Sequence, residues 1–77
     1  MPQSTARILL ADDRIDKLMA MEAVLSPLKV EIVKVRSGAE ALEAVAAREF
    51  AAALLDVKMP VMDGFETARK IRELPRG

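Results

Sequence analysis

Three carboxylates stand where two apolar runs of the sequence end. Asp12 and Asp13 follow the run Arg7–Ala11 (RILLA), and Asp56 closes the run Ala51–Asp56 (AAALLD). A carboxylate at the exit of a buried strand costs free energy unless water, a cationic partner or a metal ion stabilises its charge. The sequence therefore predicts a stabilising partner close to Asp56.

A shared metal ion would stabilise all three carboxylates at once. In an open α/β sheet, ligands bind at the carboxyl ends of the strands, so the three side chains converge if the two strands are neighbours. Like charges at that distance repel one another unless a cation neutralises them. The sequence has no His and no Cys, so the site is all oxygen, which favours Mg²⁺ over zinc or copper. We therefore predict a Mg²⁺ site formed by Asp12, Asp13 and Asp56.

Several of these residues also have a simpler explanation. Asp12 or Asp13 could be the N-cap of the helix that follows, with Asp16 in its first turn, and this role does not exclude metal binding. Asp63, in an Asp-Gly pair, is better explained as a turn and N-cap residue than as a ligand. Lys58 is in most cases a solvated loop lysine. At this stage the cap and the metal ligand stay open as alternatives for the acidic pair.

The first predicted helix begins at Ile15, where the spacing of apolar residues changes to three and four. Its apolar face carries four residues that we expect in the core: Leu18, Met21, Leu25 and Leu28. The pair Ser26-Pro27 marks its end, because the residue before proline avoids the helical region. The sequence thus predicts a helix directly after the acidic pair.

The remaining elements alternate in the same way. Val30–Val35 is rich in β-branched residues and predicts a second strand. Ser37 and Glu40 fit a capping box that opens a helix to about Arg48. Further elements are a third strand, a loop and a third helix, at residues 51–56, 57–63 and 64–74. The order β-α-β-α-β-α predicts an α/β fold with parallel strands and right-handed crossovers.

The composition excludes several classes of function. The 77 residues suffice for one small domain, and twelve basic residues balance twelve acidic ones, so neither a nucleic-acid footprint nor a polybasic membrane patch is present. Without Cys and His there are no disulfides, zinc fingers, thiol catalysis or Ser-His-Asp triads, and no phosphohistidine donor within the chain. The polar start MPQSTAR and the absence of a long apolar run predict a cytosolic protein.

Two segments of the sequence resemble a known family. ILLADD, followed by a predicted helix, and LLDVKMPVMDGFE are similar to the receiver domain of two-component response regulators. The specific features are an acidic pair that closes the first strand and an Asp that closes the third, followed by Met-Pro and then Met-Asp-Gly. The segment SGAEAL, which opens the second helix, also resembles the family.

This resemblance implies a role for each carboxylate. Asp56 would accept a phosphoryl group from a phosphohistidine, on a sensor histidine kinase or a phosphotransfer protein, or from a small acyl phosphate. Asp13 would bind Mg²⁺ directly, Asp12 chiefly through a metal-bound water, and Asp56 and the backbone carbonyl of Lys58 would be further ligands. Phosphoryl transfer requires positioning and charge neutralisation, which a carboxylate nucleophile beside Mg²⁺ supplies. The implied function is a phospho-accepting signalling domain rather than an enzyme, although self-phosphorylation chemistry is possible.

The resemblance extends from about Arg7 to Leu74, roughly the first three-fifths of a flavodoxin-like fold of five βα units. It implies a three-layer sandwich with strand order 2-1-3, one truncated receiver domain over residues 1–77 and a flexible segment over residues 1–6. The Lys and the Ser or Thr that complete the family's switch belong to its later strands and have no counterpart here. The third strand would be an exposed apolar edge, for which we expect a homodimer or a domain-swapped oligomer.

Two functions from different classes follow. The first is a phospho-accepting receiver module of a two-component phosphorelay, with no direct binding of nucleic acid or membrane. The alternative is a non-phosphorylated, receiver-like dimerisation or interaction module that lacks the Lys and Ser/Thr switch residues. The three clustered carboxylates favour the first, because packing alone does not need them. An aspartate-nucleophile phosphatase is disfavoured, because Asp56-Val-Lys58 lacks the Asp-x-Asp arrangement of that class.

Overall fold

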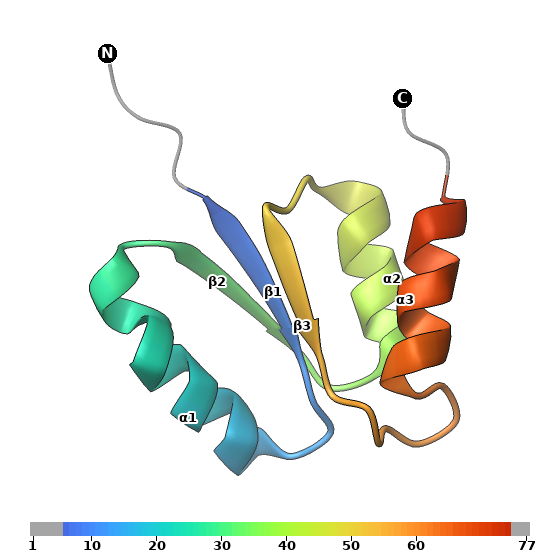
Figure 1. The fold of residues 1–77 in the computed structure, drawn as a ribbon, viewed down its shortest axis with the longest axis horizontal. Coiled ribbons are helices and arrows are strands. Elements are labelled where there is room, and N and C mark those ends of the chain that lie inside the picture. Colours follow the sequence, from blue (N-terminus) through green and yellow to red (C-terminus); the bar gives the residue numbers. More distant parts are fainter. Residues whose placement is uncertain (1–5, 75–77) are drawn as a thin grey trace.

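The computed structural model describes residues 6–74 and contains one parallel sheet with helices on both of its faces (Figure 1). The elements follow the predicted order β-α-β-α-β-α, with a short 3₁₀ turn after the first helix. Their bounds are β1 (Arg7–Ala11), α1 (Ile15–Leu25), the 3₁₀ turn (Ser26–Leu28), β2 (Glu31–Val35), α2 (Gly38–Ala47), β3 (Ala52–Leu55) and α3 (Gly64–Glu73). The predicted α/β class is therefore confirmed.

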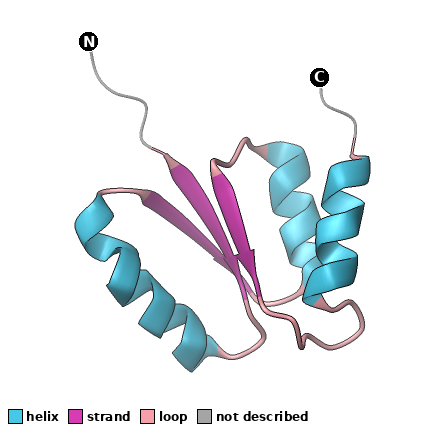
Figure 2. Cartoon of the chain, in the orientation of Figure 1, coloured by secondary structure: helices cyan, strands magenta, loops and turns pink. Residues whose placement is uncertain are grey.

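The strands lie in the order β2-β1-β3, so β1 is the central strand (Figure 2). Both ladders are parallel, and Ala11 pairs with Val35 on one side and with Leu55 on the other. The crossovers β1–α1–β2 and β2–α2–β3 run in opposite directions across the sheet, so right-handed connections place α1 on one face and α2 on the other. Helix α3 packs against α2 on that second face. The predicted order 2-1-3 is confirmed.

Local capping sets where the second and third helices begin. The Glu40 N–H donates a 3.1 Å hydrogen bond to the Ser37 hydroxyl, as the predicted capping box requires. The Glu40 carboxylate accepts from the Arg36 N–H at 3.0 Å, one residue before the cap. Asp63 caps α3 by accepting from the Glu66 N–H at 2.8 Å, so its predicted role as an N-cap is confirmed.

The core lies mainly between the sheet and the pair α2 and α3. Side chains alternate across a strand, so Leu9 and Ala11 face these helices and Leu10 faces α1. Leu9 and Ala11 are fully buried in one cluster that also contains Val35, Ala41 and Met59. The dense packing on this side fixes the carboxyl ends of β1 and β3, where the acidic residues lie.

The face under α1 is less covered than the sequence predicts. Four apolar residues on this side were expected in the core. Only Leu18 is buried, while Met21 and Leu25 are half-buried and Leu28 is 64% exposed. The expectation was wrong for Leu28 because it lies in the 3₁₀ turn, beyond the end of the helix. Leu54 of β3, on the same face, is 44% exposed because no helix of the described residues covers it.

The third strand is an edge strand in the described part of the chain. It pairs with β1 on one side, and Ala52, Ala53 and Leu54 are exposed, so the fully buried strand that its apolar sequence suggests is not observed. The predicted flexible segment 1–6 lies outside the described residues except for Ala6, whose carbonyl accepts a hydrogen bond from the Glu31 N–H at 2.8 Å. Within residues 6–74 no helix combines the length and the apolar character needed to cross a bilayer. The predicted cytosolic location stays a prediction.

Candidate functional site

The strand register brings the three predicted carboxylates together. The Asp56 N–H donates to the Ala11 carbonyl at 2.9 Å, and the Asp12 N–H donates to the Val35 carbonyl at 3.2 Å. These bonds continue the two ladders by one step beyond the strands. As a result, one carboxylate oxygen from each of Asp12, Asp13 and Asp56 lies within 4.8 Å of the others. We refer to these three residues as the acidic cluster.

Within the acidic cluster, the three side chains differ in their accessibility. Asp12 is only 3% exposed, whereas Asp13 and Asp56 are half-buried. An Asp12 oxygen accepts a 3.0 Å hydrogen bond from the Arg14 N–H, only two residues along the chain. The N-cap position of α1 is Arg14, which makes no side-chain cap bond, so the prediction that Asp12 or Asp13 is the N-cap is wrong. The Asp12 side chain therefore closes a turn over residues 12–14, directly before α1 begins at Ile15.

The guanidinium groups of two arginines near the acidic cluster bind groups other than its three carboxylates. The Arg14 guanidinium donates to Asp16 at 2.8 and 3.2 Å, which lowers the pKa of the Asp16 carboxyl and raises the pKa of Arg14. The Arg36 guanidinium donates to the backbone carbonyl of Asp13 at 3.1 Å. This second bond ties the residue after β2 to the loop after β1 and helps to hold Asp13 in place.

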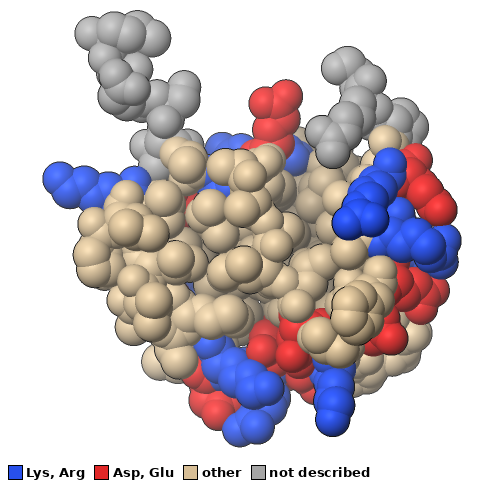
Figure 3. Space-filling model, in the orientation of Figure 1, with Lys and Arg blue, Asp and Glu red and all other residues tan. Residues whose placement is uncertain are grey.

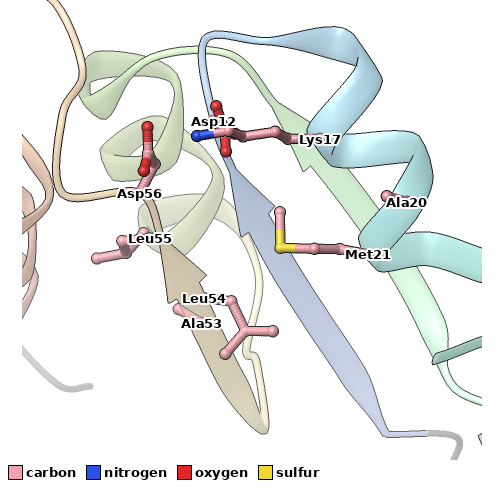
Figure 4. A pocket seen from close by; sticks show the side chains of 8 residues that line it. All are labelled: Asp12, Lys17, Ala20, Met21, Ala53, Leu54, Leu55 and Asp56. Carbon is pink, nitrogen blue, oxygen red and sulfur yellow. The ribbon is translucent and has the colours of Figure 1, made fainter. Parts of the chain in front are cut away.

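A lysine that was not predicted from the sequence also faces the acidic cluster. The Lys17 side chain extends from the first turn of α1 toward Asp12 and Asp56 (Figure 4). It lines an open cavity of about 480 Å³ between α1 and β3, together with Ala20, Met21 and other residues. The signal in the sequence is its position in the first turn of the helix that directly follows the acidic pair.

The loop from Asp56 to α3 is held by a close approach of two backbones. The Gly64 N–H donates to the Val57 carbonyl at 3.1 Å. A Cβ atom at Gly64 would overlap the carbonyl oxygen of Asp56 and lie 2.8 Å from its carbonyl carbon, closer than real Cβ atoms approach other atoms. Glycine is therefore required here by space. Lys58 in the same loop is exposed, and the ligand role of its carbonyl stays a prediction.

The acidic cluster fits a hard cation. Mg²⁺ binds oxygen ligands at about 2.0–2.1 Å, so two ligands on opposite sides of the ion are about 4.2 Å apart. The spacing of up to 4.8 Å in the cluster is close to this value and needs only small side-chain shifts. The donor set contains only carboxylates, which suits Mg²⁺ and disfavours zinc or copper. These residues could hold one Mg²⁺ and would leave other coordination positions for water and a phosphoryl oxygen.

Comparison with known proteins identifies a family. The family described as "Response regulator receiver domain" matches residues 8–77. The sensor protein EvgS of Escherichia coli K12 is 36% identical over 66 residues, which are 86% of this chain and 6% of EvgS. The chain therefore spans a small part of that curated relative.

Solved structures with the same fold include two that contain magnesium. The receiver domain of sensor histidine kinase PA1611 from Pseudomonas aeruginosa PAO1, with a magnesium ion coordinated in its active site cleft, is 30% identical with a TM-score of 0.84. The match covers 91% of this chain and 57% of that one. TrrA from Thermotoga maritima, in complex with Mg²⁺-BeF, is 30% identical with a TM-score of 0.85, over 90% of this chain and 60% of TrrA.

Proposed function

We propose that this chain, which belongs to the family of response regulator receiver domains, accepts a phosphoryl group on Asp56 beside a Mg²⁺ ion held by Asp12, Asp13 and Asp56. The observation that carries the proposal is the convergence of three carboxylate oxygens within 4.8 Å at the ends of β1 and β3. The similarity to receiver domains of phosphorelay proteins supports it, and the alternative of a module without phosphorylation is not favoured.

Of this chain's own groups, the bond-forming step uses one carboxylate as the nucleophile. An Asp56 oxygen attacks the phosphorus atom, a P–O bond to the carboxylate forms, and the bond between phosphorus and the leaving group breaks. From an acyl phosphate the leaving group departs as a carboxylate with the electron pair, and no proton moves. From a phosphohistidine the imidazole nitrogen departs and takes up a proton. When Mg²⁺ is bound, it neutralises charge on the phosphoryl oxygens during transfer.

The accessibility of the three carboxylates supports a division of roles. Asp13 is half-buried and open enough to bind Mg²⁺ directly. Asp12 is almost fully buried and already accepts a hydrogen bond from the Arg14 N–H, which suits a contact through a metal-bound water. The backbone carbonyl of Lys58 completes the proposed ligand set.

The phosphoryl donor is a separate group, because these 77 residues contain no histidine. We propose a sensor histidine kinase or a phosphotransfer protein as the physiological donor, by analogy with the sensor kinases that this chain resembles. The balance of twelve basic and twelve acidic residues gives no reason to add direct binding of nucleic acid or membrane to this function.

We propose that the 77-residue chain by itself forms a homodimer through the outer edge of β3. A domain-swapped oligomer is a variant of this assembly. The face beside this edge carries no charged side chains over a broad area (Figure 3), and a groove there is lined by apolar residues: Ala20, Met21, Val24, Leu25 and Leu54. A second copy offers the same unpaired edge, so a two-fold axis would satisfy both edges and bury both grooves.

Light scattering tests the assembly. We expect a dimer for the wild type, a monomer for Leu54→Lys, which places a charge on the apolar face, and a dimer for the control Val61→Lys, whose side chain is fully exposed elsewhere. A wild-type chain that stays monomeric at high concentration would refute the dimer.

The phosphoryl function is tested by intact mass after incubation with Mg²⁺ and acetyl phosphate. We expect one phosphoryl adduct in the wild type and none in Asp56→Asn. Asp63→Asn is the matched control, since Asn also caps a helix well and Asp63 lies outside the acidic cluster. No adduct in a wild-type protein that circular dichroism shows to be folded would refute the proposal.

A further inference from the structure

We propose that Lys17 binds the transferred phosphoryl group. Its ammonium group contacts the phosphoryl oxygens once the group is on Asp56. This inference rests on the proposed function and deepens it, because it assigns a cation of this chain to the anionic part of the substrate.

The position of Lys17 follows from the connection between β1 and α1. The helix begins at Ile15, two residues after Asp13, so its first turn lies beside the carboxyl ends of the strands. Lys17 points from this turn across the mouth of the cavity, and its nitrogen lies toward Asp12 and Asp56 (Figure 4). Its aliphatic stem can lie along the apolar wall of Ala20 and Met21 while the charged end stays in water.

Three other basic residues around this end of the sheet have partners, while Lys58, in the loop after Asp56, is exposed. Arg14 binds Asp16, Arg36 binds the carbonyl of Asp13, and Lys34 of β2 pairs with Glu22 at 2.7 Å. Among the ion pairs of residues 6–74, none within 4.0 Å involves Lys17. Lys17 is thus a cation that faces the acidic cluster without being bound to another carboxylate.

The charge of the loaded site explains what this cation is for. Three carboxylates and one Mg²⁺ leave one net negative charge where an anionic phosphoryl group must arrive. The ammonium group of Lys17 cancels this charge. A lysine suits the role because its ammonium is a compact charge on a flexible stem and binds phosphate oxygens without a fixed orientation.

A binding role predicts two effects of opposite sign. The positive charge of Lys17 repels Mg²⁺ and attracts the phosphoryl group. Lys17→Met, which keeps the apolar stem, should therefore bind Mg²⁺ more tightly and accept phosphoryl more slowly. A purely structural role of Lys17 would weaken both or change neither.

The experiment measures both quantities on the full 77-residue chain. Mg²⁺ affinity is taken from ¹⁵N chemical shifts, and the phosphorylation rate from intact mass at saturating Mg²⁺ with acetyl phosphate. For Lys17→Met we expect roughly threefold to tenfold slower phosphorylation and a roughly twofold to fivefold lower Mg²⁺ dissociation constant, as for one charge several Å away in a partly solvated site. Lys17→Arg should restore most of the rate. Lys70→Met removes the same charge on α3, where Lys70 pairs with Glu66, and should change neither quantity.

The outcomes separate this inference from the function it rests on. A wild-type adduct that forms at the same rate in Lys17→Met would overturn the role of Lys17 and leave the role of Asp56 intact. A Lys17→Met protein that loses both Mg²⁺ affinity and phosphorylation rate would likewise overturn the role of Lys17 and leave that of Asp56 intact. No adduct in the wild type would overturn the proposed function and, with it, the phosphoryl contact of Lys17.

Discussion

The close approach of Gly64 to the backbone of Asp56 is tested by the sign of the stability change in Gly64→Ala. Gly64 is the first residue of α3, where alanine is favoured over glycine by up to about 1 kcal/mol through helix propensity alone. In this structure, however, the added Cβ would lie 2.8 Å from the Asp56 carbonyl carbon. The atoms in its way are backbone, so they cannot move aside as a flexible side chain can.

We expect Gly64→Ala to destabilise the fold. Overpacking of this kind costs about 1–3 kcal/mol, and subtracting a propensity gain of about 1 kcal/mol leaves a net loss of up to about 2 kcal/mol. For a domain of this size each kcal/mol lowers the melting temperature by about 4–8 °C. Thermal unfolding followed by circular dichroism measures this, because the chain has no Trp or Tyr for fluorescence.

The matched control is Gly38→Ala, at the first residue of α2. Its Cβ would press on the Thr67 hydroxyl and on the Met62 carbonyl, at the contact between α2 and α3. We expect a loss of stability from both variants, and a loss of Mg²⁺ binding only from Gly64→Ala, because only that residue touches Asp56. A Gly64→Ala protein that melts higher than the wild type would refute the close approach and the placement of Asp56 that depends on it.

Three further predictions concern stability. Ser37→Ala removes the N-cap bond to the Glu40 N–H and should cost about 1 kcal/mol by urea unfolding, whereas Ser37→Thr should cost much less; equal losses would contradict the cap. Leu9→Ala empties a fully buried site in the core and should cost about 2–5 kcal/mol; a loss below that range in the same assay would mean that Leu9 is not buried. The pKa of Asp16 is lowered by hydrogen bonds from Arg14, so this pair stabilises the fold above the ordinary pKa of aspartate, and its contribution is lost as the pH falls through the lowered value. Asp16→Asn should therefore melt slightly below the wild type at neutral pH and level with it in acid; a difference that does not change with pH would contradict the pairing.

The acidic cluster was predictable because it depends on strand ends. RILLA and AAALL each stop at a carboxylate, and parallel strands bring their carboxyl ends to one edge, so neighbouring strands suffice to bring Asp12, Asp13 and Asp56 together. The caps at Ser37 and Asp63 were predictable for a similar reason, since each depends on residues within one helical turn.

The features that the sequence did not reveal depend on contacts between distant segments. Leu28 has the spacing of a core residue, but its exposure depends on the 3₁₀ turn that follows α1. Lys17 resembles any lysine on a helix surface until the β1–α1 connection turns it toward Asp56. Asp12, Asp13 and Asp16 are all acidic residues near the start of α1, and N-cap propensity does not show which of them accepts a backbone hydrogen bond. In the structure Asp12 accepts from the Arg14 N–H, and Arg14 takes the N-cap position.

The central claim is that Asp56 accepts a phosphoryl group through a cation site that it shares with Asp12 and Asp13. The most direct measurement is the rate of phosphoryl adduct formation, by intact mass, as Mg²⁺ is titrated at a fixed concentration of acetyl phosphate. The account predicts a saturable rise with Mg²⁺ in the wild type, no adduct in EDTA, and loss of the Mg²⁺ dependence in Asp13→Asn. An adduct that forms equally fast in EDTA, or an Asp13→Asn protein with the wild-type Mg²⁺ dependence, would contradict it.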